Sequence, residues 1–199
     1  VMGLPLGVLS AVKQYSPADS FLRVASTVLV AMPTFWLAML LILVFALYLG
    51  WLPAGGALTW QSYILPTITV GVPYGSKVLR MTRSTMLEEI RQDYVRTARS
   101  KGVPEKKVIY GHALKNALLP VITTIGSAFG AILGGSVIAE SVFNLPGLGS
   151  LIVLSIKAKD TPSVLASVLL LAVFFALIML IVDLVYAFID PRIKAKYAK

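Results

Sequence analysis

The polar side chains best placed to bind a partner lie in one stretch, residues 93–120 (DYVRTARSKGVPEKKVIYGHALKNALLP). This is the longest polar run in a chain that is otherwise almost entirely apolar, and apolar segments of membrane length flank it on both sides. We interpret the stretch as a docking element for a partner, with contact to anionic lipid as the alternative. The basic residues of the stretch are Arg96, Arg99, Lys101, Lys106, Lys107 and Lys115.

The sequence offers few residues that could carry out catalysis or bind a metal. The chain has no cysteine and a single histidine, His112, so it offers neither a thiolate metal site nor a histidine-rich cluster. The segment GVPYGSK at 71–77 has the wrong spacing for a phosphate-binding P-loop, and GLGS at 147–150 has no buried histidine to activate its serine. The sequence therefore predicts no catalytic residue, no metal and no cofactor, and we do not expect this chain to be an enzyme.

The composition indicates that lipid is the solvent of most of the chain. Of 199 residues, 57% are hydrophobic and 14% charged, and the mean hydropathy is +0.84. A soluble domain of this size could not bury so much apolar surface. We therefore expect an all-α, polytopic membrane helix bundle forming a single transmembrane domain.

Uncharged segments of about 20 residues suffice to cross a bilayer, and they predict the spans. Residues 1–12 are apolar but cover only about half of the hydrocarbon core at 1.5 Å per residue, so we expect a partial span in an N-terminally truncated chain. Pro33 lies inside the first full span, where it is expected to bend the helix. The full spans are predicted at 24–49, 62–83, 116–139 and 161–189, with a loop at 91–115 on one side and a loop at 140–160, containing a short helix at 148–157, on the other.

The distribution of basic residues predicts the orientation. Sixteen of the 18 Lys and Arg residues fall in loops that this topology places on one side, and only Lys157 and Lys159 on the other. Cytosolic loops carry the excess of Lys and Arg. The 91–115 loop and the C-terminus are therefore predicted to be cytosolic.

The local pattern of the cytosolic loop predicts two helices joined by a corner. A first helix would keep Leu87, Ile90, Tyr94, Val95 and Ala98 on one face and end at Gly102, which tolerates a positive φ. Pro104 and Glu105 would begin a second, short helix, since proline suits a first helical turn and an acidic side chain the positive helix N-terminus. Val108, Ile109, His112 and Ala113 give this short helix an apolar stripe.

Two interpretations of this loop are open. A basic loop next to a membrane commonly does no more than set topology and contact anionic lipid. The corner and the apolar stripe on both arms, which lipid attraction does not require, favour docking of an amphipathic helix into the groove of a partner.

The loop resembles the coupling loop of permeases of ABC importers, in the dipeptide, oligopeptide and nickel branch of that family. Against the general pattern E-A-A-x-x-x-G, nine residues, I-x-L-P, residues 96–98 occupy the E-A-A positions, Gly102 the glycine, and residues 112–115 (HALK) the I-x-L-P positions. The likeness to the branch continues through most of the chain, in its order, and lacks the family's first helix. The segments similar to the branch are DYVRTARSKG, HALKNALLP, PTFWLAMLLILVFALYLGWLPAGG, LPTITVG, RMTRSTMLEEIRQDYV, GGSVIAESVFNLPGLG and VDLVYAFIDPR.

The resemblance implies a subunit whose movement is driven by ATP hydrolysis in a separate partner subunit. A separate cytosolic ABC ATPase would grip the short helix at about 103–113, and closure of two ATPases would move two permease subunits between inward-facing and outward-facing states. The residues implied in ATPase coupling are Asp93, Tyr94, Arg96, Thr97, Ala98, Lys101, Gly102, Val103, Pro104, Val108, His112 and Leu114.

The implied partners are the ATPase subunits, a second permease that family precedent makes a paralogue, an external substrate-binding protein and the lipid bilayer, with no nucleic acid. The setting would be the cytoplasmic membrane of a bacterium or archaeon. The implied cargo is a di- or oligopeptide, with nickel or another small solute as the alternative. An ion-gradient-driven secondary transporter is a rival, although it normally requires an intramembrane carboxylate at mid-depth.

Other candidate residues lie in or beside the spans. Asp183 is the one acid well inside a span, near its inner boundary, and we expect a structural ion pair with Arg80 or Arg83 in preference to a proton relay. Glu140, Pro146 and Gly147 are candidates for an outer gate or a contact with the binding protein, with an ordinary end-of-helix acid as the alternative for Glu140. The residues expected in helix packing or the pathway are Pro33, Gly126, Gly130, Gly134 and Gly135.

Overall fold

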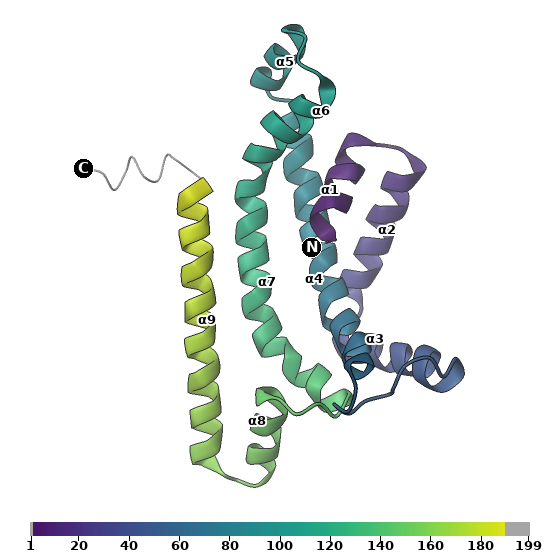
Figure 1. Ribbon diagram of the computed structural model, residues 1–199, viewed down its shortest axis with the longest axis vertical. Coiled ribbons are helices and arrows are strands. Elements are labelled where there is room, and N and C mark those ends of the chain that lie inside the picture. Colours follow the sequence, from purple (N-terminus) through teal and green to yellow (C-terminus); the bar gives the residue numbers. More distant parts are fainter. Residues whose placement is uncertain (1, 190–199) are drawn as a thin grey trace, which may run out of the picture. The chain divides into compact units, whose positions relative to one another are not determined.

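The computed structural model describes residues 2–189, except the side chains of 133–135 and 186–189. Within that part of the chain the ordered elements are all helical, which confirms the all-α prediction (Figure 1). The elements are α1 (Gly3–Val12), α2 (Pro17–Ala31), α3 (Thr34–Leu41), the π-helical η1 (Ile42–Tyr48), the 3-10 turn η2 (Trp60–Tyr63), α4 (Ile64–Ile90), α5 (Asp93–Ser100), α6 (Glu105–Lys107), the π-helical η3 (Val108–Ala113), α7 (Leu114–Val142), α8 (Leu148–Lys157) and α9 (Thr161–Ile189).

The chain forms two compact units. The first contains residues 2–29, 75–126 and 181–189 of the described chain, and the second contains residues 30–74 and 127–180. Each of the long helices α4, α7 and α9 therefore contributes one part to each unit.

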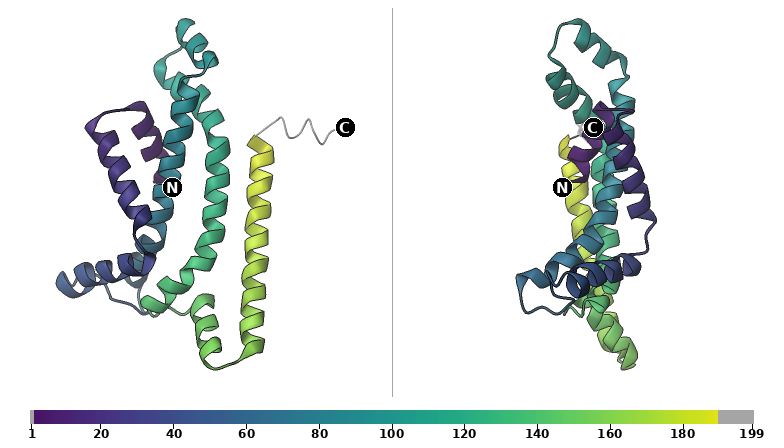
Figure 2. Two further views of the ribbon diagram at one scale, coloured as in Figure 1. Left: turned by 180° about the vertical axis from the view of Figure 1, so that it is seen from behind. Right: turned by 90° about the vertical axis from the view of Figure 1, so that its right-hand side faces the viewer.

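In the first unit, α1 and α2 form a hairpin beside α4 (Figure 2). Glycine permits the close approach of α1, because a Cβ at Gly7 would lie 2.5 Å from the Cβ of Thr82 and a Cβ at Gly3 would collide with the carbonyl of Gly75. The core of this unit, called here the loop core, joins α1, α4, α5, η3 and α7. Its buried members are Val8, Ala11, Met86, Val95, Val108, Ile109, Ala113 and Ala117.

The second unit has its own small core of Ala38, Leu65, Ala139 and Phe143. The segment before η2 is held to it through the backbone, since the N–H of Gly56 donates to the carbonyl of Phe143 at 2.8 Å. This core brings α3, α4 and the end of α7 together.

The helix predicted across 24–49 breaks completely at Pro33. α2 ends at Ala31, α3 begins at Thr34, and Pro33 takes an extended ψ of 136° between them. Proline has no N–H to donate and drives the preceding residue out of the helical region. The sequence predicted one bent helix at Pro33, whereas the structure has two separate helices, α2 and α3.

Two helical runs among the described residues are long and apolar enough to cross a membrane, Glu105–Ile132 and Thr161–Val185. The pair Pro17–Ala31 and Thr34–Tyr48 makes a third if it counts as one span. These runs overlap the predicted spans at 116–139, 161–189 and 24–49. The span predicted at 62–83 lies on α4, which is not among them, and it stays a prediction, as does the division of the chain into one partial and four full spans.

Candidate coupling surface and interior contacts

The loop between α4 and α7 begins with a break that the sequence pattern did not predict. α4 ends at Ile90, and Gln92 is extended, with ψ 151°, immediately before α5. In one continuous helix Met86 and Val95 would lie about 13 Å apart along the axis. The break turns α5 so that both side chains are fully buried in the loop core. The expectation of one helix running from Leu87 through Ala98 is therefore wrong, because tertiary packing overrides the helical spacing.

The corner at Gly102 forms as predicted. Gly102 has φ +75°, its N–H donates to the carbonyl of Arg99 at 2.9 Å, and the N–H of Val103 donates to the carbonyl of Ala98 at 3.2 Å. These two bonds make a Schellman motif, the common glycine-dependent helix ending. Ala98 and Val103 also pack against the loop core, so the corner is held by backbone bonds and by apolar contact.

An ion pair spans the outside of the same corner. Arg99 Nη2 lies 2.7 Å from Glu105 Oε1, and Arg99 Nε lies 3.1 Å from Glu105 Oε2. The hydrogen bonds from the guanidinium lower the pKa of the Glu105 carboxyl below its usual value. Pro104 precedes α6 as its N-cap residue, with ψ 137°, one position earlier than the predicted first turn.

The second arm of the corner is not a separate short helix. α6 continues through the π-helical residues 108–113 into α7, and Glu105–Ile132 is one helical run of 28 residues. Val108, Ile109 and Ala113 face the loop core and are buried, so the apolar stripe predicted for partner docking is covered by the chain itself. His112, the fourth member of the stripe, is exposed, and the grip of an ATPase on the segment at about 103–113 stays a prediction.

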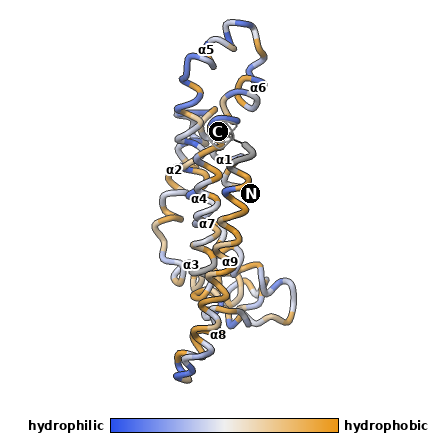
Figure 3. Tube along the Cα trace, turned by 90° about the vertical axis from the view of Figure 1, so that its left-hand side faces the viewer, coloured by the Kyte–Doolittle hydropathy of each residue, from blue (hydrophilic) through white to orange (hydrophobic). Residues whose placement is uncertain are grey.

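Exposed polar residues of the loop lie on α5 and around the corner, and Figure 3 shows this part of the tube as predominantly hydrophilic. Val108 is buried among the residues predicted to couple, and Ala98, Val103 and Leu114 are half-buried. The exposed members of the predicted set are Asp93, Tyr94, Arg96, Thr97, Lys101, Gly102, Pro104 and His112.

The Tyr94 side chain is hydrogen-bonded to the last turn of α4. Its hydroxyl donates to the Glu89 carboxylate across the break between α4 and α5. Partial burial, followed by this hydrogen bond, raises the pKa of Tyr94 to about 12. The phenol therefore stays protonated and available as a donor at neutral pH.

A buried ion pair in the first unit was missed by the sequence reasoning. Arg83 of α4 binds Asp19 of α2 with both nitrogens of one edge, Nε to Oδ1 at 2.7 Å and Nη2 to Oδ2 at 2.9 Å. Ser10 Oγ of α1 donates to Oδ1 at 2.5 Å and the N–H of Tyr15 donates to Oδ2 at 3.0 Å. The Asp19 side chain is fully buried and that of Arg83 is 17% exposed.

This ion pair connects three helices, α1, α2 and α4. Bidentate arginine–carboxylate pairs are among the stronger and more directional side-chain contacts in proteins. The two charged residues are 64 positions apart in sequence, so no local spacing could reveal the pair. The one available signal was an acidic residue in the first turn of a helix otherwise rich in apolar side chains.

Comparison with known proteins assigns the family. The model for "Binding-protein-dependent transport system inner membrane component" matches residues 3–195. The chain belongs to this family. The match covers almost the whole sequence, including the corner and the buried ion pair.

Named relatives are close in sequence to this chain. "Glutathione transport system permease protein GsiC" of Pectobacterium atrosepticum is 45% identical over 199 residues, covering 98% of this chain and 64% of the relative. The proteins of the same name in Escherichia coli K12 and Salmonella paratyphi A are 43% and 44% identical over 196 residues, with the same coverage. The chain thus spans about 64% of the length of these curated relatives.

The predicted ion pair between Asp183 and Arg83 is corrected by the geometry of the buried pair. Arg83 of α4 makes its ion pair with Asp19, which lies in the first turn of α2. Asp183 is exposed on α9, and the ion pairs of the described residues do not include it or Arg80. A structural ion pair between Asp183 and Arg83 is therefore wrong for this structure.

Glu140 caps a helix in the second unit. Its Oε2 accepts a hydrogen bond from the N–H of Ser150, in the first turn of α8, at 2.9 Å. A Cβ at Gly147 would collide with this carboxylate, and one at Gly149 would lie 2.6 Å from the Cα of Val137. A carboxylate is favoured at a helix N-terminus, so Glu140 ties α8 to α7. The gate proposed for Glu140, Pro146 and Gly147 stays a prediction.

The glycine spacing of α7 coincides with close contacts to α9. In the first unit a Cβ at Gly126 would lie 2.6 Å from Val182 Cγ1, and in the second unit a Cβ at Gly130 would collide with the ring of Phe175. Small residues allow such close approach between helices. Gly134 and Gly135 continue the pattern, but their surroundings lie outside the described residues.

Proposed function

We propose that the chain forms the greater part of a permease subunit of an ATP-driven importer for short peptides, with glutathione as the first candidate cargo. Family membership and the names of the relatives support an importer permease. Glutathione is itself a tripeptide, which agrees with the peptide branch that the sequence resembles. The cargo assignment depends on these similarities.

The observation that carries the proposal is the two-sided build of the coupling loop. One side, with Val95, Val108 and Ala113, is completely buried in the loop core, and the other side presents charged residues to solvent. A partner can therefore contact α5 and the corner while the buried side transmits its displacement to α1, α4 and α7. This division of faces is what a docking element between two subunits requires.

The face proposed to contact the partner is accordingly the exposed side of α5 with the corner at 101–107, and not the buried stripe of 108–113. Its basic side chains, with Arg96 and Lys101 among them, suit an acidic groove on the partner. ATP binding to that partner supplies the difference in affinity between two states of the importer. The proposed assembly contains two ATPases, a second permease and an external binding protein, in a cytoplasmic membrane with the 91–115 loop and C-terminus inside.

A matched pair of glycine substitutions tests the coupling role. Gly102→Ala forces a Cβ onto a left-handed residue at a cost of about 1–2 kcal/mol, whereas Gly111→Ala adds a Cβ in an exposed helical position whose one near contact is a Lys107 side-chain atom at 3.6 Å. In the full-length importer reconstituted in proteoliposomes, we expect Gly102→Ala to lower ATPase retention and ATP-dependent glutathione uptake several-fold. Gly111→Ala should remain near wild type.

Uptake that continues after removal of the ATPase subunits would refute the ATP-driven mechanism and favour an ion-gradient transporter. Uptake that requires ATP but excludes glutathione and accepts another peptide or nickel would retain the coupling role and correct the cargo. Equal behaviour of the two glycine variants would show that the corner does not transmit the ATPase step.

A further inference from the structure

A cationic cavity lies between α2 and α4 in the first unit, beside the buried ion pair. It has a volume of about 250 Å³ and is lined by Arg23, Ser26, Thr27, Arg80, Arg83 and Ser84; we call it the arginine cavity. Arg83 is neutralised by Asp19. Arg23 and Arg80 are exposed, and neither takes part in the ion pairs of the described residues. Among the described residues, these two positive charges therefore have no ion-pair partner.

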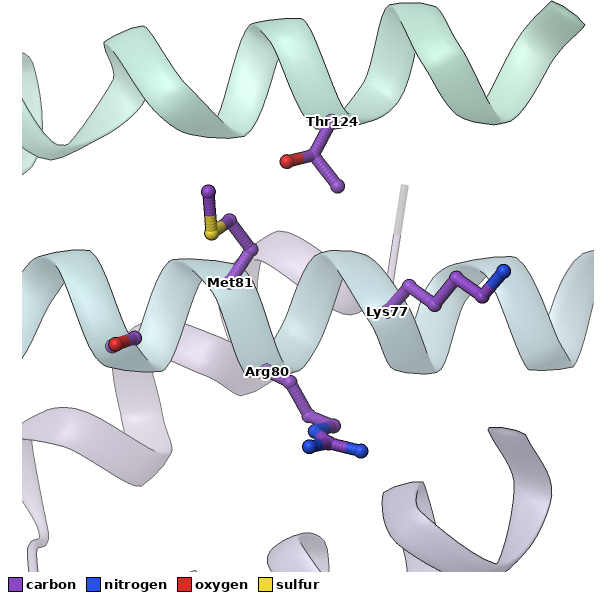
Figure 4. A pocket seen from close by; sticks show the side chains of 5 residues that line it. Lys77, Arg80, Met81 and Thr124 are labelled. Carbon is purple, nitrogen blue, oxygen red and sulfur yellow. The ribbon is translucent and has the colours of Figure 1, made fainter. Parts of the chain in front are cut away.

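The lining is suited to an oxyanion. Guanidinium groups bind phosphate oxygens through paired N–H donors, and the Ser84 hydroxyl lies on the same wall of α4 as Arg80. Figure 4 shows the Arg80 side chain extending from the side of α4 opposite Thr124, whereas Met81 extends toward α7. Arg80 also borders a second hollow, of about 350 Å³, lined by Lys77, Met81, Ser84 and Thr124. Arg80 could therefore contact an anion bound in either hollow.

An apolar groove adjoins the arginine cavity. It is lined by Ser20, Arg23, Val24, Thr27 and Val28; we call it the valine groove. Arg23 and Thr27 belong to both surfaces, so the charged and apolar parts are contiguous along α2. Val24 and Val28 are 65% and 45% exposed. A free anion would need only the arginine cavity, whereas a molecule with an anionic head and a hydrocarbon chain would use both.

The depth of the cavity agrees with a lipid headgroup. Arg80 lies about 24 Å along α4 from Ile64, at 1.5 Å per residue, which is close to the thickness of a hydrocarbon core of ~30 Å. With the orientation proposed above, Arg80 on α4 and Arg23 in the second turn of α2 both lie at the cytosolic headgroup level. Basic pockets between helices at this level are suited to anionic lipid headgroups.

We propose that the arginine cavity and the valine groove together bind one anionic phospholipid of the cytosolic leaflet. Its phosphodiester contacts Arg23, Arg80 and Ser84, and one acyl chain lies along Val24 and Val28. Two uncompensated arginines disfavour the ammonium group of a zwitterionic lipid, so phosphatidylglycerol is preferred over phosphatidylcholine. The bound lipid fills the space between α2 and α4 and supplies the negative charge that the cavity lacks. The proposal uses the proposed orientation but does not depend on ATPase coupling or on the cargo.

Native mass spectrometry of the full-length permease in its assembled importer tests the site. The complex is released from nanodiscs of equimolar phosphatidylcholine and phosphatidylglycerol, and the retained lipid is counted. At about 1 kcal/mol per basic residue, Arg23→Gln/Arg80→Gln should lower relative affinity for phosphatidylglycerol about 30-fold. Lys13→Gln/Arg91→Gln removes the same charge from the proposed cytosolic side, outside both surfaces, and should retain the lipid. Neither pair disturbs the Asp19–Arg83 bond, so the variants should assemble, as size-exclusion chromatography verifies.

A second pair of measurements separates a lipid from a soluble anion. Val24→Ser/Val28→Ser should weaken phosphatidylglycerol retention while leaving the arginines in place, and inorganic phosphate or glutathione should not displace the lipid. Equal loss in the Arg23/Arg80 and Lys13/Arg91 variants would overturn the site. Displacement by phosphate or glutathione, with no effect of the valine substitutions, would overturn the lipid assignment and make the arginine cavity a site for a soluble oxyanion.

Discussion

Two arginine–carboxylate pairs in this protein have almost the same bond geometry and entirely different surroundings. Arg83 and Asp19 meet at 2.7 and 2.9 Å, and Arg99 and Glu105 meet at 2.7 and 3.1 Å. The Asp19 side chain is fully buried, whereas that of Glu105 is 59% exposed. The residues of the first pair are 64 positions apart in sequence, and those of the second are six positions apart, across the corner.

The difference shows that bond length does not set the energetic weight of an ion pair. At the surface, water solvates either partner when the other is lost, and such pairs contribute about 0–1 kcal/mol. In the interior, the remaining charge has no solvent to replace its partner. Loss of the Asp19–Arg83 pair should therefore affect the whole first unit, and loss of the Arg99–Glu105 pair only the corner.

The largest effect is expected for Asp19→Asn. This change leaves the Arg83 guanidinium largely buried without its counterion, which costs about 3–5 kcal/mol of unfolding free energy. Denaturation of the full-length protein in mixed detergent micelles, followed by circular dichroism, measures it. Glu88→Gln is the control, since Glu88 is exposed near the polar end of α4, and it should change stability by less than about 0.5 kcal/mol.

The double variant Asp19→Asn/Arg83→Gln sharpens the comparison. Removing both charges should restore part of the stability lost in Asp19→Asn, because no uncompensated guanidinium remains. A double variant less stable than Asp19→Asn by the full cost of Arg83→Gln would show that the two side chains do not interact energetically.

An intermediate effect is expected for Glu140→Ala. The N–H of Ser150 loses its carboxylate acceptor at the start of α8, and the loss of such a cap costs about 1 kcal/mol. Hydrogen exchange at Ser150 should accelerate in the full-length protein, with little change in the first unit. Ser141→Ala, an exposed change on the next residue of α7, is the control. Unchanged exchange in Glu140→Ala would show that the cap does not stabilise α8.

The smallest effect is expected for Glu105→Gln, below about 1 kcal/mol. The direction in which the stabilising effect of this ion pair changes with pH follows from the lowered pKa of Glu105. The contribution is complete above the ordinary glutamate pKa of about 4.3 and is lost as the pH falls through the lowered folded-state value. Hydrogen exchange at Gly102 and Val103, compared between wild type and Glu105→Gln from about pH 3 to pH 7, measures it. A difference that grows as the pH falls would contradict this assignment.

The features predictable from sequence were those determined by the conformational preferences of single residues. Gly102 has the left-handed conformation that its place after a helical pattern required, and the basic, polar character of the loop follows directly from its residues. The helical class follows from composition, since long apolar segments in lipid satisfy their backbone bonds internally.

Features determined by packing could not be predicted. The helical spacing from Leu87 to Ala98 gave no sign of the break at Gln92. That break allows Met86 and Val95 to pack into one core. The partner of Arg83 depended on the position of α2, and the predicted Asp183 was the wrong carboxylate. Pro33 marked the correct position, but a proline in a sequence does not show whether it will bend a helix or divide it into two.

The π-helical segment at 108–113 has a consequence for variation in loop length. A π turn accommodates one residue more than an α turn, and one residue corresponds to about 100° of rotation around a helix axis. A segment of this kind can absorb a single-residue insertion locally, while Val95 before it and Ala117 beyond it remain in the same core. A chain shorter by one residue at this point could form an ordinary α turn, so the corner at 101–107 and α7 can tolerate a change of length between them without a change of fold.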